Sequence, residues 1–139
     1  MTKISIGIDP GKNTGFAVFC HIEKRLIECR TLLIHEALEI VRHIAEYDEH
    51  TEVVIEDPFT WVPFRRQKAD NSRLQGAGSV KRDFTIWKDF CESNKIQYRT
   101  VKLQSAIKKL PAKQFFQLTG WSEKSSVHAR DAAMLVFRT

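Results

Sequence analysis

Cysteine is scarce in this 139-residue chain, and its placement argues against a cysteine-based framework. The chain has an odd number of cysteines, and none of them forms a Cys-x-x-Cys pair; they are Cys20, Cys29 and Cys91. Disulfide scaffolds and zinc ribbons both need paired or closely spaced cysteines. We therefore expect ordinary reduced thiols and no structural zinc.

Long apolar runs are also missing. No stretch approaches the roughly 20 apolar residues that cross a bilayer as a helix, and the first residues lack the apolar segment of a secretory signal. Internal repeats and low-complexity segments are absent as well. With 42% hydrophobic residues available for a core, we expect one compact cytoplasmic domain with no membrane partner.

Positive charge is present but unevenly distributed. The whole sequence has 22 Lys and Arg against 17 Asp and Glu, a net charge of +5. Residues 65–113 hold 13 of the basic residues and only four acids, so the rest of the chain is net negative. This uneven distribution of charge favours a polyanionic partner for residues 65–113, although a lysine-rich, solvated helix face would give the same composition.

Two predicted strands end in an acid, and a proline follows each of them. Residues 4–8 alternate between apolar and small or polar up to Asp9, and residues 52–56 form an apolar run that ends at Glu56. Open α/β sheets place their chemistry at such strand tips. If the two strands are parallel neighbours, Asp9 and Glu56 share one site. The alternative is that each acid only caps a turn or ends an exposed strand.

The remaining pattern predicts a mixed α/β order. Strands are expected at 16–20, 25–31 and 96–101, helices at 34–48, 73–93, 111–118 and 127–135, and a loop at 59–71. Three strands, a helix, then strand, helix, strand and terminal helix is the order of an RNase H-like fold. We predict a five-stranded mixed sheet, its first three strands antiparallel, flanked by helices.

The last predicted helix carries a second pair of polar residues. His128 and Asp131 are spaced i, i+3 and therefore share one face, while the opposite face is apolar and should pack on the sheet. Beside the first strand, this helix would bring both residues up to Asp9 and Glu56. The alternatives are that Asp131 is a surface acid or pairs with Arg130, and that His128 is an ordinary part-buried histidine.

Taken together, these four residues favour a metal site. Carboxylate oxygens suit Mg²⁺ or Mn²⁺, whereas zinc would need more Cys and His. Two such ions can activate a water and stabilise the leaving oxygen of a phosphodiester. We predict Asp9, Glu56, His128 and Asp131 as catalytic and metal-binding residues for two Mg²⁺ ions, with Mn²⁺ as a substitute and no small-molecule cofactor.

At these positions the chain resembles the RuvC-type Holliday junction resolvases. The resemblance is carried by Gly7-Ile8-Asp9-Pro10-Gly11 with Thr14-Gly15, by Val54-Ile55-Glu56 with Phe59, and by His128-Ala129-Arg130-Asp131-Ala132. It implies Asp9, Glu56 and Asp131 as metal ligands, and His128 where members have Asp or His. It also implies that Phe59 wedges into the junction and that residues 1–139 form a single RNase H-like nuclease domain.

The resemblance further implies a Mg²⁺-dependent endodeoxyribonuclease that acts on branched DNA as a homodimer and resolves four-way junctions by paired symmetric nicks. The helix with Gly76, Gly78, Phe84 and Trp87 is the candidate subunit interface. Expected DNA-binding residues are Phe59, Arg65, Arg66, Lys68, Arg73, Lys81, Lys108, Lys109 and Lys113. The segment after Glu56 departs from the family pattern, which fits a diverged member carried by a phage or mobile element and acting in the host-cell cytoplasm.

Two other functions agree with the same residues. One is an RNase H-like nuclease that processes RNA, which would also have acids at its strand tips. The other is a non-catalytic module that binds branched DNA, which the loss of an acid from the set would favour.

Overall fold

The structure is a computed structural model that describes residues 1–58 and 71–138, with residues 71–77 described by their backbone alone. Phe59, Arg65, Arg66 and Lys68, all predicted to bind DNA, lie outside the described residues. The side chain of Arg73 lies outside them as well.

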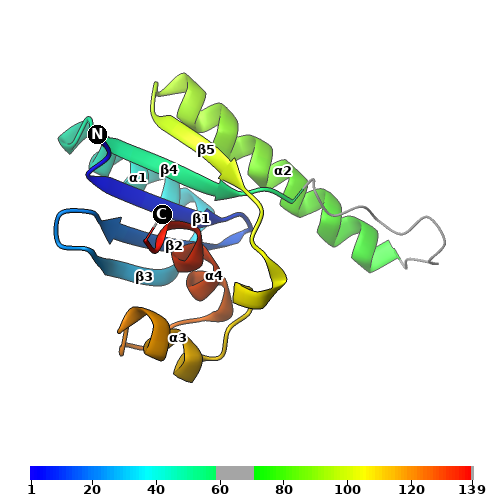
Figure 1. Cartoon of the computed structure of the whole chain (residues 1–139). Helices are drawn as coiled ribbons and strands as arrows, with labels where there is room; N and C mark the ends of the chain where they lie inside the picture. The colour runs from blue at the N-terminus through cyan, green and yellow to red at the C-terminus, as the bar shows by residue number, and fades with distance from the viewer. Residues whose placement is uncertain (59–70, 139) are drawn as a thin grey trace.

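A five-stranded mixed sheet forms the centre of the molecule (Figure 1). Its strands are β1 (Ile4–Asp9), β2 (Asn13–Cys20), β3 (Arg25–Leu33), β4 (Thr51–Glu56) and β5 (Gln97–Val101), in the order β3-β2-β1-β4-β5. The first three strands are antiparallel, and β4 lies parallel to both β1 and β5. The predicted five-stranded mixed sheet is confirmed, and the two strands that end in acids are parallel neighbours.

Helices cover both faces of the sheet. They are α1 (Ile34–Tyr47), α2 (Asn71–Ser93), α3 (Ala112–Thr119) and α4 (Val127–Val136), with a 3₁₀ turn at Ser105–Ile107 that the sequence pattern did not predict. The Ser126 hydroxyl caps α4 by accepting a hydrogen bond from the Ala129 N–H. Gly120 ends α3 in the left-handed conformation, at a φ of 77°. Within the described parts of the chain, no helix is long and apolar enough to span a membrane.

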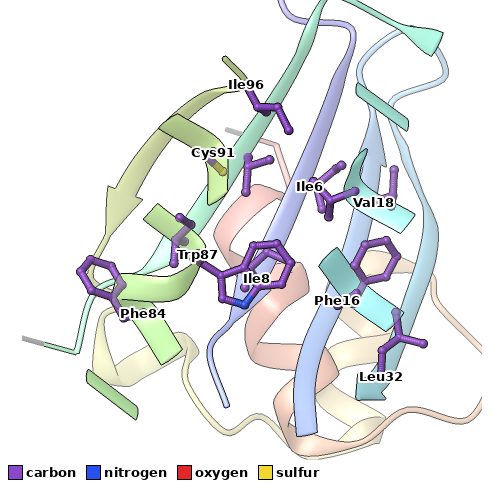
Figure 2. Packing of buried hydrophobic residues seen from close by; sticks show 13 residues of the cluster. Ile6, Ile8, Phe16, Val18, Leu32, Phe84, Trp87, Cys91 and Ile96 are labelled. Carbon is purple, nitrogen blue, oxygen red and sulfur yellow. The ribbon is translucent and has the colours of Figure 1, made fainter. Parts of the chain in front are cut away.

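One core lies between the sheet and the pair α1 and α2 (Figure 2). Ile6, Ile8 and Phe16 point into it from the sheet, and α2 contributes Phe84 and Trp87, which are 4% and 0% exposed. These two aromatics of the predicted interface helix are therefore buried in this chain's own core and are not available to a second subunit. The use of α2 itself as a subunit interface stays a prediction. Burial of the apolar face of an amphipathic helix removes apolar surface from water, which stabilises the folded chain.

A second core lies beneath α4 on the other face of the sheet. Two glycines let this helix approach the strands closely. A Cβ on Gly7 would lie 2.0 Å from the Ala132 carbonyl oxygen, and one on Gly15 would lie 2.1 Å from the His128 carbonyl oxygen. The backbone of α4 therefore rests directly on β1 and β2, which brings the polar residues of this helix to the strand ends.

Candidate metal centre

Three carboxylates from three separate elements meet at one edge of the sheet. Asp9 ends β1, Glu56 ends β4 and Asp131 lies on α4, and one oxygen from each lies within 4.8 Å of the others. The β1–β4 register pairs Ile8 with Ile55, so both strands end at the same edge. Asp131 reaches this edge because α4 crosses the strands at close range.

Burial perturbs the acids of this cluster. The Asp9 side chain is 14% exposed. Loss of solvent, followed by the negative charge of Glu56, raises the pKa of Asp9 from 3.8 to about 7. Burial also raises the pKa of Asp131, and the hydrogen bond from the Lys109 N–H opposes that rise. Close, buried like charges are costly without a counter-charge, and a divalent cation would supply one.

His128 touches the cluster from its solvent side. Its Nδ1 lies 2.8 Å from Asp9 Oδ2, and its side chain is 62% exposed. This hydrogen bond lowers the pKa of Asp9 and therefore partly offsets the effect of burial. The exposed imidazole both orients the carboxylate and has access to water.

Lys108 contacts the cluster through its side chain. Its Nζ lies 2.8 Å from Glu56 Oε2. Burial alone would lower the pKa of Lys108, but the hydrogen bond and charge of Glu56 outweigh burial and raise it. The sequence indicated Lys108 only as a DNA contact, because no local pattern pairs it with an acid 52 residues away.

The next residue contacts the cluster through its backbone. The Lys109 N–H donates a 2.7 Å hydrogen bond to Asp131 Oδ1, and Lys109 has a φ of 55°, in the left-handed region that non-glycine residues seldom adopt. Arg130, an expected alternative partner for Asp131, instead donates to the Leu110 carbonyl and to Ser125.

A cleft of about 620 Å³ opens over these groups. Its lining residues are Asp9, Pro10, Glu56, Asp57, Pro58, Val80, Lys102, Leu103, Lys108, Lys109, Val127, His128 and Asp131. Lys102 was not among the predicted DNA contacts and lies at this cleft. Lys81 on α2 and Lys113 on α3 are absent from the lining, and Lys113 is exposed. The cleft is therefore lined by three lysines together with the clustered carboxylates.

The donor set fits a hard divalent cation. All three clustered side chains offer carboxylate oxygen, which Mg²⁺ and Mn²⁺ bind, and among the described residues no cysteine belongs to the cluster. The spacing within 4.8 Å allows these oxygens to share bound ions.

No protein-family model matches the sequence, and no curated protein matches it. Solved structures match its fold. RuvC from T. thermophilus in complex with Holliday junction substrate aligns with a TM-score of 0.60 and 16% identity, over 96% of this chain and 90% of that chain. A second T. thermophilus RuvC structure aligns with a TM-score of 0.54 and 14% identity, over 96% and 91% of the two chains. The chain therefore has the RNase H-like fold of RuvC, as its sequence motifs predicted.

Proposed function

We propose that this chain is a metal-dependent DNA endonuclease that resolves four-way junctions by paired symmetric nicks. The observation that carries the proposal is the cluster of Asp9, Glu56 and Asp131, which β1, β4 and α4 bring within 4.8 Å. Its fold is that of a protein whose structure was solved with Holliday junction substrate. Under this proposal the whole range 1–139 acts as one nuclease domain, because both ends of the chain supply ligands.

Asp9, Glu56 and Asp131 would hold two Mg²⁺ ions, or Mn²⁺ in their place, with His128 as a further ligand or proton carrier. When bound, such ions make a water more acidic and stabilise negative charge on the leaving oxygen of a phosphodiester. His128 orients the Asp9 carboxylate through its 2.8 Å contact. Its exposed ring is also placed to pass a proton to solvent.

The lysines at the cleft would hold the DNA backbone. Lys108 and Lys109 line the cleft beside the acids. Lys81 on α2 and Lys113 on α3 do not line it, and their proposed contacts with DNA rest on the sequence pattern. Each phosphate contact releases counterions, so binding should weaken steeply as salt rises. The proposed roles of Phe59, Arg65, Arg66, Lys68 and Arg73 rest on the sequence pattern.

Paired symmetric nicks need two active sites, so the proposal includes a homodimer in the cytoplasm. With Phe84 and Trp87 buried in the core, the interface would have to use other surfaces. Sedimentation at micromolar concentration tests this part separately. A monomer across that range would remove the paired-cut mechanism while leaving single-strand nicking possible.

The decisive experiment incubates the chain with a labelled synthetic four-way junction in Mg²⁺ or Mn²⁺. Asp9→Asn, Glu56→Gln and Asp131→Asn are the matched variants, since each keeps the side-chain shape and removes one charge. We expect symmetric nicks from the parent chain, and junction binding without nicks from all three variants. A duplex of the same sequence is the control for structure selectivity.

Other outcomes separate the alternatives. Binding without cleavage by the parent chain, in either metal, would identify a non-catalytic branched-DNA module. Cleavage of RNA in preference to the junction would identify an RNA-processing nuclease. Cleavage that survives all three substitutions would show that this cluster is not the active site.

A further inference from the structure

Three consecutive residues before α3 each make one contact with the metal centre or its helix. The Lys108 ammonium contacts Glu56, the Lys109 N–H donates to Asp131 Oδ1, and the Leu110 carbonyl accepts from Arg130 Nε at 2.7 Å. We call residues 108–110 the site loop. Two of its three contacts depend on backbone atoms, so the loop's conformation, and not only its side chains, sets the surroundings of Asp131.

Arg130 is one of the groups that attach this loop to α4, through the Leu110 carbonyl. It is 8% exposed, and its Nη1 also donates to the Ser125 carbonyl at 2.5 Å and to Ser125 Oγ at 3.1 Å. Among the described residues, none of its hydrogen bonds goes to a carboxylate. A buried guanidinium needs its donors satisfied. Here the accepting oxygens belong to Leu110, just before α3, and to Ser125, just after it. The guanidinium therefore ties both flanking segments to α4.

The backbone of the site loop has a conformation that needs support from neighbouring contacts. Lys109 adopts a φ of 55°, which costs a non-glycine residue free energy and persists only where neighbouring contacts enforce it. Arg130 donates its hydrogen bond to the carbonyl of Leu110, the residue directly after Lys109. Asp131 directly follows Arg130 on α4, so the same helical turn carries both the arginine that contacts the loop and the carboxylate that the loop contacts.

We propose that Arg130 is a positioning residue, whose guanidinium clamps the site loop so that the Lys109 N–H fixes the orientation of the Asp131 carboxylate. Arg130 itself does not line the cleft, so it would act through the loop. Its effect on cleavage rests on the proposed function, but its effect on the loop does not. A lysine at this position would keep the charge, yet its single ammonium lacks the planar fork that reaches two segments at once.

The test is amide hydrogen exchange at Lys109 in the metal-free chain, comparing the parent with Arg130→Met and Arg130→Lys. We expect the Lys109 amide to exchange about tenfold faster or more in both variants, because its hydrogen bond to Asp131 opens more often. Amides in the centre of β1 should keep their rates. If Arg130→Met does not fold, the lysine variant alone decides the result.

Two matched controls separate the clamp from general destabilisation and from loss of charge. Val136→Ala removes buried volume from the same helix, and Arg42→Met removes an arginine from α1 on the opposite face of the sheet. Neither should change Lys109 exchange relative to the β1 amides. An unchanged Lys109 rate in both Arg130 variants, or an equal increase in Val136→Ala, would overturn the proposal.

Cleavage kinetics provide an independent readout. If the chain cuts junctions, Arg130→Lys should lower kcat and leave KM nearly unchanged, because the ligand is misplaced while the DNA contacts remain. A rise in KM alone would contradict the positioning role. If no junction is cut but Lys109 exchange depends on Arg130, the proposed function fails and the clamp stands.

Discussion

The imidazole Nδ1 of His128 lies 2.8 Å from Oδ2 of Asp9, although 119 residues separate the two in the chain. One side chain is largely exposed and the other is 14% exposed. The contact therefore links a buried, electrostatically unfavourable carboxylate to a group in solvent. Because the hydrogen bond lowers the pKa of Asp9, it helps to keep that carboxylate ionised near neutral pH.

Removing this contact with His128→Ala should raise the pKa of Asp9 beyond its present value of about 7. The acid limb of the pH–rate profile for junction cleavage should then move to higher pH by about one unit. At a given pH below neutral, the rate of cleavage should therefore be about tenfold lower. His43→Ala, an exposed histidine that pairs with Glu39 on α1, is the control. An unmoved acid limb in His128→Ala would show that the contact does not tune Asp9.

The metal-free chain should lose stability as pH rises. Asp9 has a pKa of about 7 in the folded chain and about 3.8 unfolded, so between these values the folded state binds more protons. The free energy of unfolding should therefore fall between about pH 4 and pH 7 and then level off. One pKa unit corresponds to about 1.4 kcal/mol, so the fall should amount to a few kcal/mol.

Urea titrations in EDTA at pH 5 and pH 7.5 measure this fall. Asp9→Asn should flatten it and should be more stable than the parent at pH 7.5. Added Mg²⁺ should restore stability to the parent at pH 7.5 but not to the Asp9→Asn variant to the same degree. The same pH dependence in the variant would assign the effect to other groups.

Gly15→Ala should displace α4 from the sheet. The added methyl would lie 2.1 Å from the His128 carbonyl oxygen and 2.9 Å from Asp9 Cβ, and the first of these is backbone that cannot rotate away. We expect a loss of about 1–3 kcal/mol in unfolding free energy, together with weaker Mn²⁺ binding. Gly78→Ala is the control, since it has no neighbour within 4 Å and should stabilise α2 by about 1 kcal/mol. Equal stability of the two variants would contradict the close packing.

Lys108→Met should separate metal binding from DNA binding. The ammonium at 2.8 Å from Glu56 competes with a metal ion for that carboxylate, so its removal should tighten Mn²⁺ binding several-fold. The same change should weaken junction binding. It should also reduce the slope of log binding constant against log salt concentration by about 0.9, which corresponds to the loss of one phosphate contact. Electron paramagnetic resonance of free Mn²⁺ and filter binding over a salt series measure the two effects.

The control for Lys108→Met is Lys113→Met on α3. Lys113 is exposed and does not line the cleft, so its loss should affect the salt slope alone. Weaker Mn²⁺ binding in Lys108→Met would mean that the lysine supports the metal site instead of competing with it.

Local patterns predicted the elements well. Alternation identified β1, a short apolar run identified β4, and helical spacing identified α1. Ser126 and Gly120 mark helix ends where capping rules place them. Strand tips and an i, i+3 pair were enough to select Asp9, Glu56, His128 and Asp131, which the structure brings together. Helical spacing placed Phe84 and Trp87 on an apolar helix face, but it does not show whether the chain itself or a second subunit covers that face. The structure buries both side chains in the chain's own core.

Local sequence was enough to predict which segments become strands and helices and which carboxylates stand at their ends, because these depend on neighbours a few residues apart. The close approach of α4 to the sheet and the contacts of the site loop with the acids depend instead on long-range packing. The docking of α4 depends on Gly7 and Gly15 meeting backbone oxygens from the far end of the chain. The Lys108–Glu56 pair, the strained Lys109 and the buried Arg130 depend on that docking. Contacts between residues so distant in the chain leave no period in the sequence, and they arise only when the packed elements bring those atoms together.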